Sequence, residues 1–242
     1  MTIEVVPLSE ADIPDAIEII QTAFADDPYF TWVFDADKFN KQRNNDSLTA
    51  RCLWGINNAL FYVAKETVTP NEDRNRDIDT PTPDQPQSEQ QGQGKDQILG
   101  ISCWLPPQPP SEPTTWTAWF HDCLLSFRQL TNNIRYLGRG GLNVSRYYIW
   151  KEQQRVAQSQ IWTDPRGYYF CNMVAVSPKA QGKGVGKKLF EVVTERADRE
   201  GMRCYLESSK KVPNVEIYGR MGFEMRLEME CKDGDGDGDS CM

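Results

Sequence analysis

A glycine-rich turn between an apolar strand and an amphipathic helix constrains this chain more than any other segment. The sequence from Val174 to Leu189 predicts the end of a strand, a turn with three glycines in five residues (182–186), and the start of a helix. Glycines leave the backbone bare, so a ligand can approach it closely. Amides at a helix start point outward and favour negative charge. Because lysines flank these glycines, the segment predicts a site for a phosphorylated ligand.

The spacing of the glycines argues against two common phosphate-binding motifs. A P-loop needs Lys-Ser or Lys-Thr five residues after its first glycine, whereas Gly182 is followed at that distance by two lysines. A dinucleotide fingerprint places its third glycine one residue later than Gly186 and lies near the start of a βαβ unit. The segment Gln181–Gly186 instead resembles the Gln/Arg-x-x-Gly-x-Gly/Ala loop of the GNAT superfamily, the acyl-CoA-dependent N-acetyltransferases.

A second segment strengthens this resemblance. The stretch from Asn214 to Phe223 is similar to the closing segment of the family, in which a short helix carries a tyrosine and ends in Gly-Phe. Asn214, Tyr218, Gly222 and Phe223 match that pattern. The resemblance covers residues 168–231, is weaker over the N-terminal part, and is absent from the middle of the chain.

The resemblance implies an α/β (α+β) fold in a single domain over residues 1–231. Its central sheet is mixed and mostly antiparallel, with two splayed parallel central strands and helices on both faces. The two splayed strands correspond to residues 168–176 and 203–207. The pattern of apolar residues further predicts strands over 2–6, 59–64, 98–104 and 223–231, and helices over 13–25, 39–55, 115–132, 142–160, 184–200 and 213–221.

The net charge of −8 is confined to two segments. Residues 66–97 carry eight acidic and three basic side chains, and residues 232–242 carry four and one. Residues 66–97 have almost no large apolar side chains, so we expect a disordered acidic insertion there. We expect a flexible acidic tail over 232–242, because its Asp-Gly repeats lack the glutamate and exiting helix of a calcium loop. The remaining chain is neutral, so no nucleic-acid partner is expected.

Histidine and cysteine usage predicts no metal site. His121 is the only histidine, and the seven cysteines show no Cys-x-x-Cys spacing. Scattered cysteines in odd number indicate reduced thiols. Without a leader segment or a long apolar run, we expect a cytoplasmic protein that contacts no membrane. The sequence leaves open whether it is a monomer or a homodimer.

The resemblance also implies the chemistry. An amine attacks the thioester of acetyl-CoA directly, in a ternary complex. Tyr218 would donate a proton or a hydrogen bond to the departing CoA thiolate. Glu207 is a candidate general base, because Asn172 is an amide where some relatives carry an acid. Asp27, Phe30 and Trp32 would border the acceptor. The residues expected to bind acetyl-CoA are Val174, Ala175, Val176, Gln181, Gly182, Lys183, Gly184, Val185, Gly186, Lys187, Asn214 and Tyr218.

The aromatic residues of the middle segment allow two interpretations. They form part of a lid over the acceptor, or they fill the core. We expect the acceptor to be the primary amine of a small molecule; a protein or peptide amine, or a non-catalytic acyl-CoA-binding protein, are the alternatives. These aromatic residues are Trp116, Trp119, Phe120, Tyr136, Tyr147, Tyr148 and Trp150.

Overall fold

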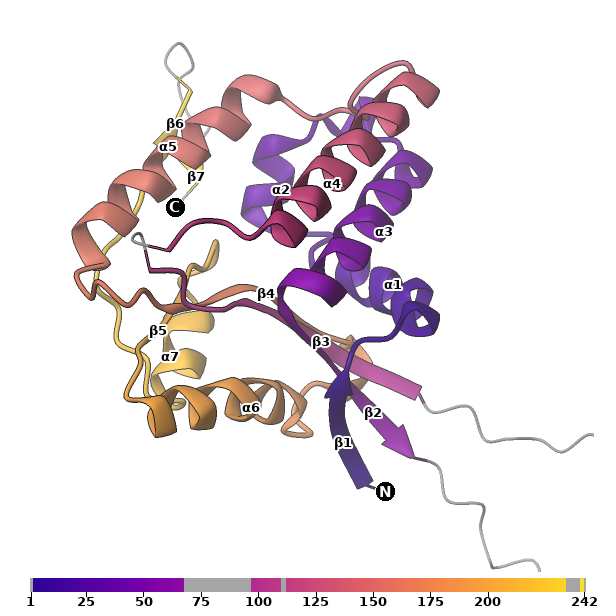
Figure 1. Cartoon of the computed structure of the whole chain (residues 1–242). Helices are drawn as coiled ribbons and strands as arrows, with labels where there is room; N and C mark the ends of the chain where they lie inside the picture. The colour runs from indigo at the N-terminus through magenta and orange to yellow at the C-terminus, as the bar shows by residue number, and fades with distance from the viewer. Residues whose placement is uncertain (1, 68–96, 110–111, 234–239, 242) are drawn as a thin grey trace, which may run out of the picture.

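A mixed five-stranded sheet forms the centre of the molecule (Figure 1). The computed structural model describes residues 2–67, 97–109, 112–233 and 240–241. The strand order is β1-β2-β3-β4-β5; neighbours are antiparallel except β4 and β5, which are parallel. This confirms the expected sheet. Its strands are β1 (Thr2–Pro7), β2 (Leu60–Thr67), β3 (Gln97–Leu105), β4 (Tyr169–Val176) and β5 (Cys204–Leu206).

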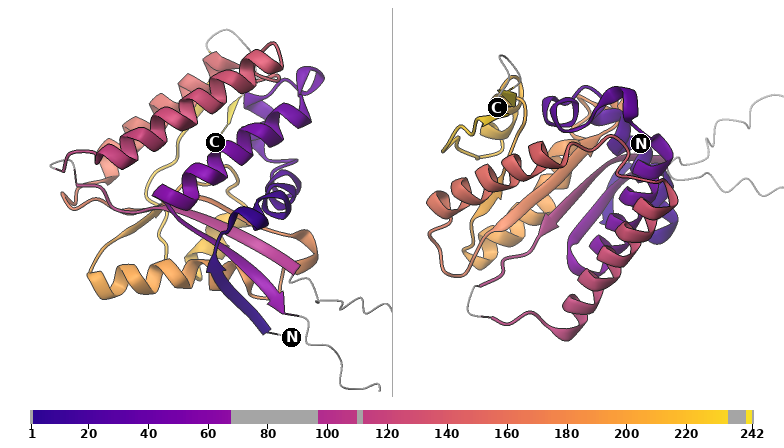
Figure 2. Two further views of the ribbon diagram at one scale, coloured as in Figure 1. Left: turned by 45° about the vertical axis from the view of Figure 1, so that its right-hand side comes forward. Right: turned by 90° about the horizontal axis from the view of Figure 1, so that it is seen from above.

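Helices cover both faces of this sheet, as expected (Figure 2). Helix α1 packs on one face and α6 on the other, while α7 and α6 lie on the same side. Helix α4 lies alongside α3, farther from the sheet. The helices are α1 (Ile13–Ala23), α2 (Pro28–Val33), α3 (Lys41–Asn58), α4 (Trp116–Arg135), α5 (Val144–Ile161), α6 (Val185–Glu200) and α7 (Asn214–Gly219).

Strand β3 is the most deeply buried strand. Residues 98–104 are all buried, because α1 covers one face of the strand and α6 covers the other. A strand covered on both faces needs apolar side chains at successive positions, which explains the nearly unbroken apolar run of this segment. Ile101 contributes to the core under α1, and Leu99 to the core under α6.

The predicted strand over residues 223–231 is wrong. Residues 223–230 form no ladder, and Met225 and Leu227 are exposed. Alternation gives a segment one apolar side, but a strand also needs a neighbouring edge for its backbone groups. Strand β5 is only three residues long, and this segment does not pair with it.

The two acidic segments are partly ordered. Strands β2 and β3 extend to Thr67 and from Gln97, into the range expected to be disordered. Residues 68–96 and 234–239 lie outside the described residues. At the C-terminal end, β6 (Cys231–Lys232) pairs with β7 (Ser240–Cys241), so part of the expected tail is a strand.

A close approach between α6 and the sheet yields a prediction about stability. A Cβ on Gly100 would lie 2.9 Å from the carbonyl oxygen of Ala175 and 3.0 Å from Cγ1 of Val185. We expect Gly100→Ala to lower the free energy of unfolding by about 1–3 kcal/mol, because backbone and helix must move apart. Chemical denaturation measures this change. Gly186→Ala is the control: its Cβ would meet only Cγ2 of Val176, at 3.7 Å, and it should cost nothing.

Candidate active site

The sheet opens between its two parallel strands. Strands β4 and β5 pair through three residue pairs, the last being Cys171 with Leu206. Strand β5 then ends, whereas β4 continues for five residues to Val176. Between the pairs Cys103–Met173 and Trp104–Cys171 the register shifts at Asn172, so β4 carries a bulge where the opening begins. A bulge bends its strand, and Asn172 is exposed at this bend.

The edge of β4 beyond Cys171 faces no strand in the described part of the chain. On its other side β4 stays paired with β3, Ser102 to Val174 and Gly100 to Val176. Backbone groups of successive strand residues point to opposite edges, so the amides and carbonyls of alternate residues within 172–176 are available along this edge. An extended ligand with amide groups could pair with this edge as a strand would.

A short 3-10 helix (Pro178–Ala180) separates β4 from the glycine-rich turn, which leads into α6. Gly182 and Gly184 have φ values of 78° and 77°, and a Cβ on either would meet no atom within 4 Å. Glycine is thus required by the backbone conformation rather than by crowding. The first amide that donates within α6 is that of Lys188, to the carbonyl of Gly184 at 3.1 Å.

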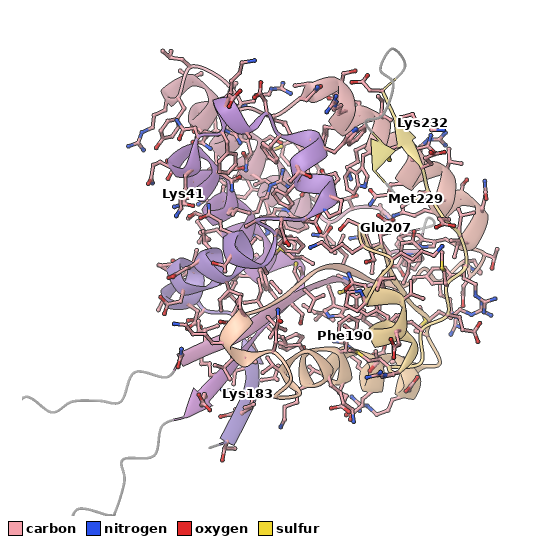
Figure 3. All side chains as sticks on the ribbon, turned by 180° about the vertical axis from the view of Figure 1, so that it is seen from behind. Lys41, Lys183, Phe190, Glu207, Met229 and Lys232 are labelled. Atoms are coloured by element: carbon pink, nitrogen blue, oxygen red, sulfur yellow. The ribbon has the colours of Figure 1, made fainter. Side chains whose placement is uncertain are left out.

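The N-terminus of α6 presents its amides to solvent. No side chain caps this helix end. The amides of residues 185–187 consequently have no intrahelical acceptor, and the helix dipole adds positive potential there. The turn also carries exposed side chains at Gln181, Lys183 and Lys187. Figure 3 labels Lys183. Val185 is different: the residue is buried in the core under α6.

Tyr218 lies on α7, at the other end of the opening. Its ring packs against Phe190 of α6, with ring centroids 5.6 Å apart. Burial raises the pKa of its phenol to about 12, and the neighbouring Cys171 and Asp27 add to the rise. The phenol therefore stays protonated at neutral pH and can donate a hydrogen bond.

Asp27 joins α2 to the loop after β5. It is buried at the N-cap of α2, where its carboxylate accepts hydrogen bonds from the amides of Tyr29 (3.0 Å) and Phe30 (3.4 Å). The hydroxyl of Ser209 donates to its second oxygen. Asp27 is thus a helix cap, and its charge also reaches Tyr218.

The two aromatic residues expected to border the acceptor have different surroundings. Phe30 is half-buried and stacks between Phe24 and Phe34, at 5.5 and 5.6 Å between centroids. Trp32 is buried in a separate cluster, with the guanidinium of Arg146 5.6 Å from its ring centroid. Phe30 can therefore present its ring to a ligand, whereas Trp32 supports the structure around it.

Asn214 does not cap α7. Its side-chain amide instead donates to Oγ of Ser208 at 2.8 Å, and no side chain caps this helix. The bond ties the start of α7 to the loop after β5, and so helps to position Tyr218.

Glu207 immediately follows β5 and is held by three donors (Figure 3). Its carboxylate accepts hydrogen bonds from Nε2 of Gln154 (2.7 Å), Nε2 of Gln158 (3.3 Å) and the hydroxyl of Tyr205 (2.9 Å). Burial, followed by the charge of Glu207, raises the pKa of Tyr205. The sequence analysis missed both glutamines; their spacing of four residues on a predicted helix was the available signal.

Two cysteines near the opening are unsuited to nucleophilic attack. Burial raises the pKa of Cys171 well above its usual value, and that of Cys204 to about 12. Because the thiolate is the reactive form, both side chains are inert at neutral pH. This agrees with chemistry that needs no acyl-enzyme.

In the described part of the chain, no helix has the length and apolar character needed to span a bilayer.

The opening of the sheet lies beside a glycine-rich helix start, an arrangement that can hold an extended ligand ending in phosphate. Residues 143–225 match the family model of the acetyltransferase (GNAT) domain. Over these residues the chain is similar to GNAT acetyltransferases.

Solved structures share this fold. The histone acetyltransferase HPA2 and related acetyltransferase from Corynebacterium glutamicum is 20% identical, with 98% of this chain and 92% of that chain covered and a TM-score of 0.50. The polyamine N-acetyltransferase of Drosophila melanogaster is 11% identical, with 99% and 92% covered and a TM-score of 0.57.

Proposed function

We propose that this protein transfers an acetyl group from acetyl-CoA to the primary amine of a small molecule. The observation that carries the proposal is the open edge of β4, which lies between the amide-rich start of α6 and the protonated phenol of Tyr218. The turn over residues 181–187 would hold the diphosphate. The edge over residues 174–176 would pair with the pantetheine arm, near Asn214.

The reaction needs three tasks. The amine must be neutral to attack, although an alkyl amine has a pKa of about 10 and is mostly charged at neutral pH. As its nitrogen bonds to the carbonyl carbon, the oxygen gains negative charge, which amides of β4 near the bulge can stabilise. The carbon–sulfur bond then breaks, and the thiolate receives a proton or a hydrogen bond from Tyr218. The nitrogen gives up its surplus proton as the amide forms, and this proton restores the phenol or leaves with water.

Glu207 is proposed to take the proton from the ammonium group, directly or through water. The two glutamines of α5 and the hydroxyl of Tyr205 orient its carboxylate. Its position on the β5 side of the opening, away from the glycine turn, suits a group that meets the acceptor rather than the cofactor.

We expect Glu207→Gln to lower kcat/KM for the amine about tenfold at neutral pH, because the substrate then loses its proton unaided. The loss should shrink as the pH approaches the pKa of the amine, where the neutral form is already abundant. Steady-state kinetics over a pH series tests this. Glu195→Gln, which makes the same change at an exposed position of α6, should keep the wild-type rate and pH profile. An E207Q enzyme with the wild-type pH profile would remove Glu207 from the mechanism.

A small acceptor is favoured by the residues around α2. The half-buried stack of Phe24, Phe30 and Phe34 offers an apolar wall, and Asp27 adds negative charge beside it. The neighbouring carboxylate of Asp26 is paired with the ammonium group of Lys210, at 3.1 Å. This combination suits an amine with a partly apolar body. The solved structures include one described as a polyamine acetyltransferase and one described as a histone acetyltransferase. The fold alone therefore does not distinguish a small-molecule acceptor from a protein acceptor.

The decisive experiment measures thiol release from acetyl-CoA with a panel of small aryl and alkyl amines and, in parallel, with lysine-containing and N-terminal peptides. We expect turnover with small amines. Turnover confined to the peptides would support the protein-acetyltransferase alternative. Acetyl-CoA binding without thiol release from any acceptor would support a non-catalytic binding protein.

A further inference from the structure

Helix α4 is amphipathic in the reverse of the usual sense. Its polar side chains face α3: Nε1 of Trp54 donates to Asp122 at 2.7 Å, Oγ of Ser47 donates to Gln129 at 2.8 Å, and the hydroxyl of Tyr136, just after the helix, donates to Asp46 at 3.0 Å. Most of its large apolar side chains are exposed, whereas Leu124 and Leu125 are partly buried. In an ordinary surface helix the apolar face is the buried one.

The exposed apolar side chains form one stripe along the helix, which we call the α4 stripe. They recur at alternating intervals of four and three residues, the spacing of a coiled-coil seam. All of them are exposed. The α4 stripe consists of Trp116, Phe120, Cys123, Phe127, Leu130 and Ile134.

This surface belongs neither to the core nor to the candidate site. Trp116, Trp119 and Phe120 were expected to fill the core or to form part of an acceptor lid, and they are 84%, 54% and 58% exposed. Figure 2 shows α4 at the periphery of the molecule. A patch of this kind marks a contact with another surface.

We propose that the α4 stripe is a homodimer interface, in which α4 of two copies pack antiparallel. The spacing favours a helix as the partner, since a seam repeating every 3.5 residues fits another helix better than a flat surface. An antiparallel pair about a twofold axis brings the same stripe to both sides, as an isologous interface requires.

The stripe complements itself in this arrangement. The twofold axis would cross the stripe at the level of residue 125 along the helix. Phe120 of one copy then meets Leu130 of the other, and Trp116 meets Ile134. The smallest member, Cys123, meets Phe127, so a small side chain faces a large one at the centre. Alternation of large and small residues across facing positions is what close packing needs.

The area also suits a dimer. The exposed aromatic surface amounts to roughly 500 Å², since each such side chain offers about 150–250 Å². It comes from Trp116, Phe120 and Phe127 (62% exposed) of the α4 stripe and from Trp119 beside the stripe. Two copies would bury roughly 1,000 Å² from these rings, and the aliphatic members bring the total to the ~1,200 Å² at which stable interfaces begin.

Charge argues against a membrane as the partner. Helices that lie on lipid carry many lysines and arginines on their polar face. Helix α4 has no lysine and two arginines, and its polar side is occupied by contacts with α3. The protein as a whole carries a net charge of −8, which anionic lipid would repel.

Sedimentation velocity of the full chain tests the proposal. We expect a concentration-dependent dimer for the wild type and a monomer for the double variant Phe127→Glu, Ile134→Glu, with circular dichroism unchanged because both side chains are exposed. Leu227→Glu, which alters an exposed apolar side chain outside α4, should still dimerise. A wild type that stays monomeric up to millimolar protein, or a dimer that survives the double variant, would overturn the proposal.

A second measurement locates the interface without disturbing it. Cys123 is exposed, whereas Cys52, Cys103, Cys171 and Cys231 are buried. A short bismaleimide should therefore link two copies through Cys123, and Cys123→Ser should abolish the product. Cross-linking that persists in C123S, or wild-type protein that stays monomeric and co-sediments with anionic vesicles, would count against a helix-to-helix dimer.

Discussion

Replacing Tyr218 by phenylalanine should lower kcat roughly 100-fold while leaving the Kd for acetyl-CoA within a factor of two. Loss of a positioned proton donor typically costs 10²- to 10⁴-fold, and we take the lower end because a thiolate is a good leaving group. The ring contact with Phe190 survives, so the fold should persist. Single-turnover kinetics and calorimetry measure the two quantities separately.

The matched control is Tyr148→Phe, which removes the hydroxyl of an exposed tyrosine on α5. It should retain full activity. Full activity in Y218F as well would mean that the phenol serves packing alone, and that the thiolate leaves without help. An unfolded Y218F protein would be recognised by circular dichroism and replaced by Tyr218→Trp.

Substituting alanine for Gly184 should weaken acetyl-CoA binding by roughly 30-fold, about 2 kcal/mol. Gly184 has a φ of 77° at the N-cap of α6, a conformation that costs a residue with a Cβ about 1–2 kcal/mol. Relaxation of that strain rotates the amides that begin the helix, which are the groups proposed to hold the diphosphate. Isothermal calorimetry with acetyl-CoA measures the loss.

Gly201 provides the control at the opposite end of the same helix. It has a φ of 61°, and a Cβ on it would meet no atom within 4 Å, as at Gly184. Gly201→Ala should therefore destabilise the protein by a similar amount and leave the Kd unchanged. Equal losses of affinity in both variants would show that α6 stability, rather than the amides of the turn, governs binding.

The parts of the structure that sequence predicted best are those fixed locally. A glycine cluster after an apolar strand predicted a turn that leads into a helix, and residues 181–184 form that turn directly before α6. Continuous apolar runs similarly predicted strands β3 and β4 to within one residue at each end. In both cases the information lies within a few adjacent residues.

The wrong predictions concern features that depend on residues distant in the sequence. Alternation over residues 223–231 predicted a strand, but pairing needs an edge that the three-residue β5 does not offer. The helix around Phe120 was predicted correctly, yet which side faces the protein depends on the polar groups of α3. Likewise, nothing within the sequence of α2 distinguishes the half-buried Phe30 from the buried Trp32.

The unmatched edge of β4 has a consequence for the protein when it is empty. Proteins normally cover or blunt exposed strand edges, because these invite pairing with other chains. In the proposed complex, bound acetyl-CoA covers this edge. The solubility and cellular lifetime of the protein would then follow the supply of that metabolite, so that abundance and catalytic readiness rise and fall together.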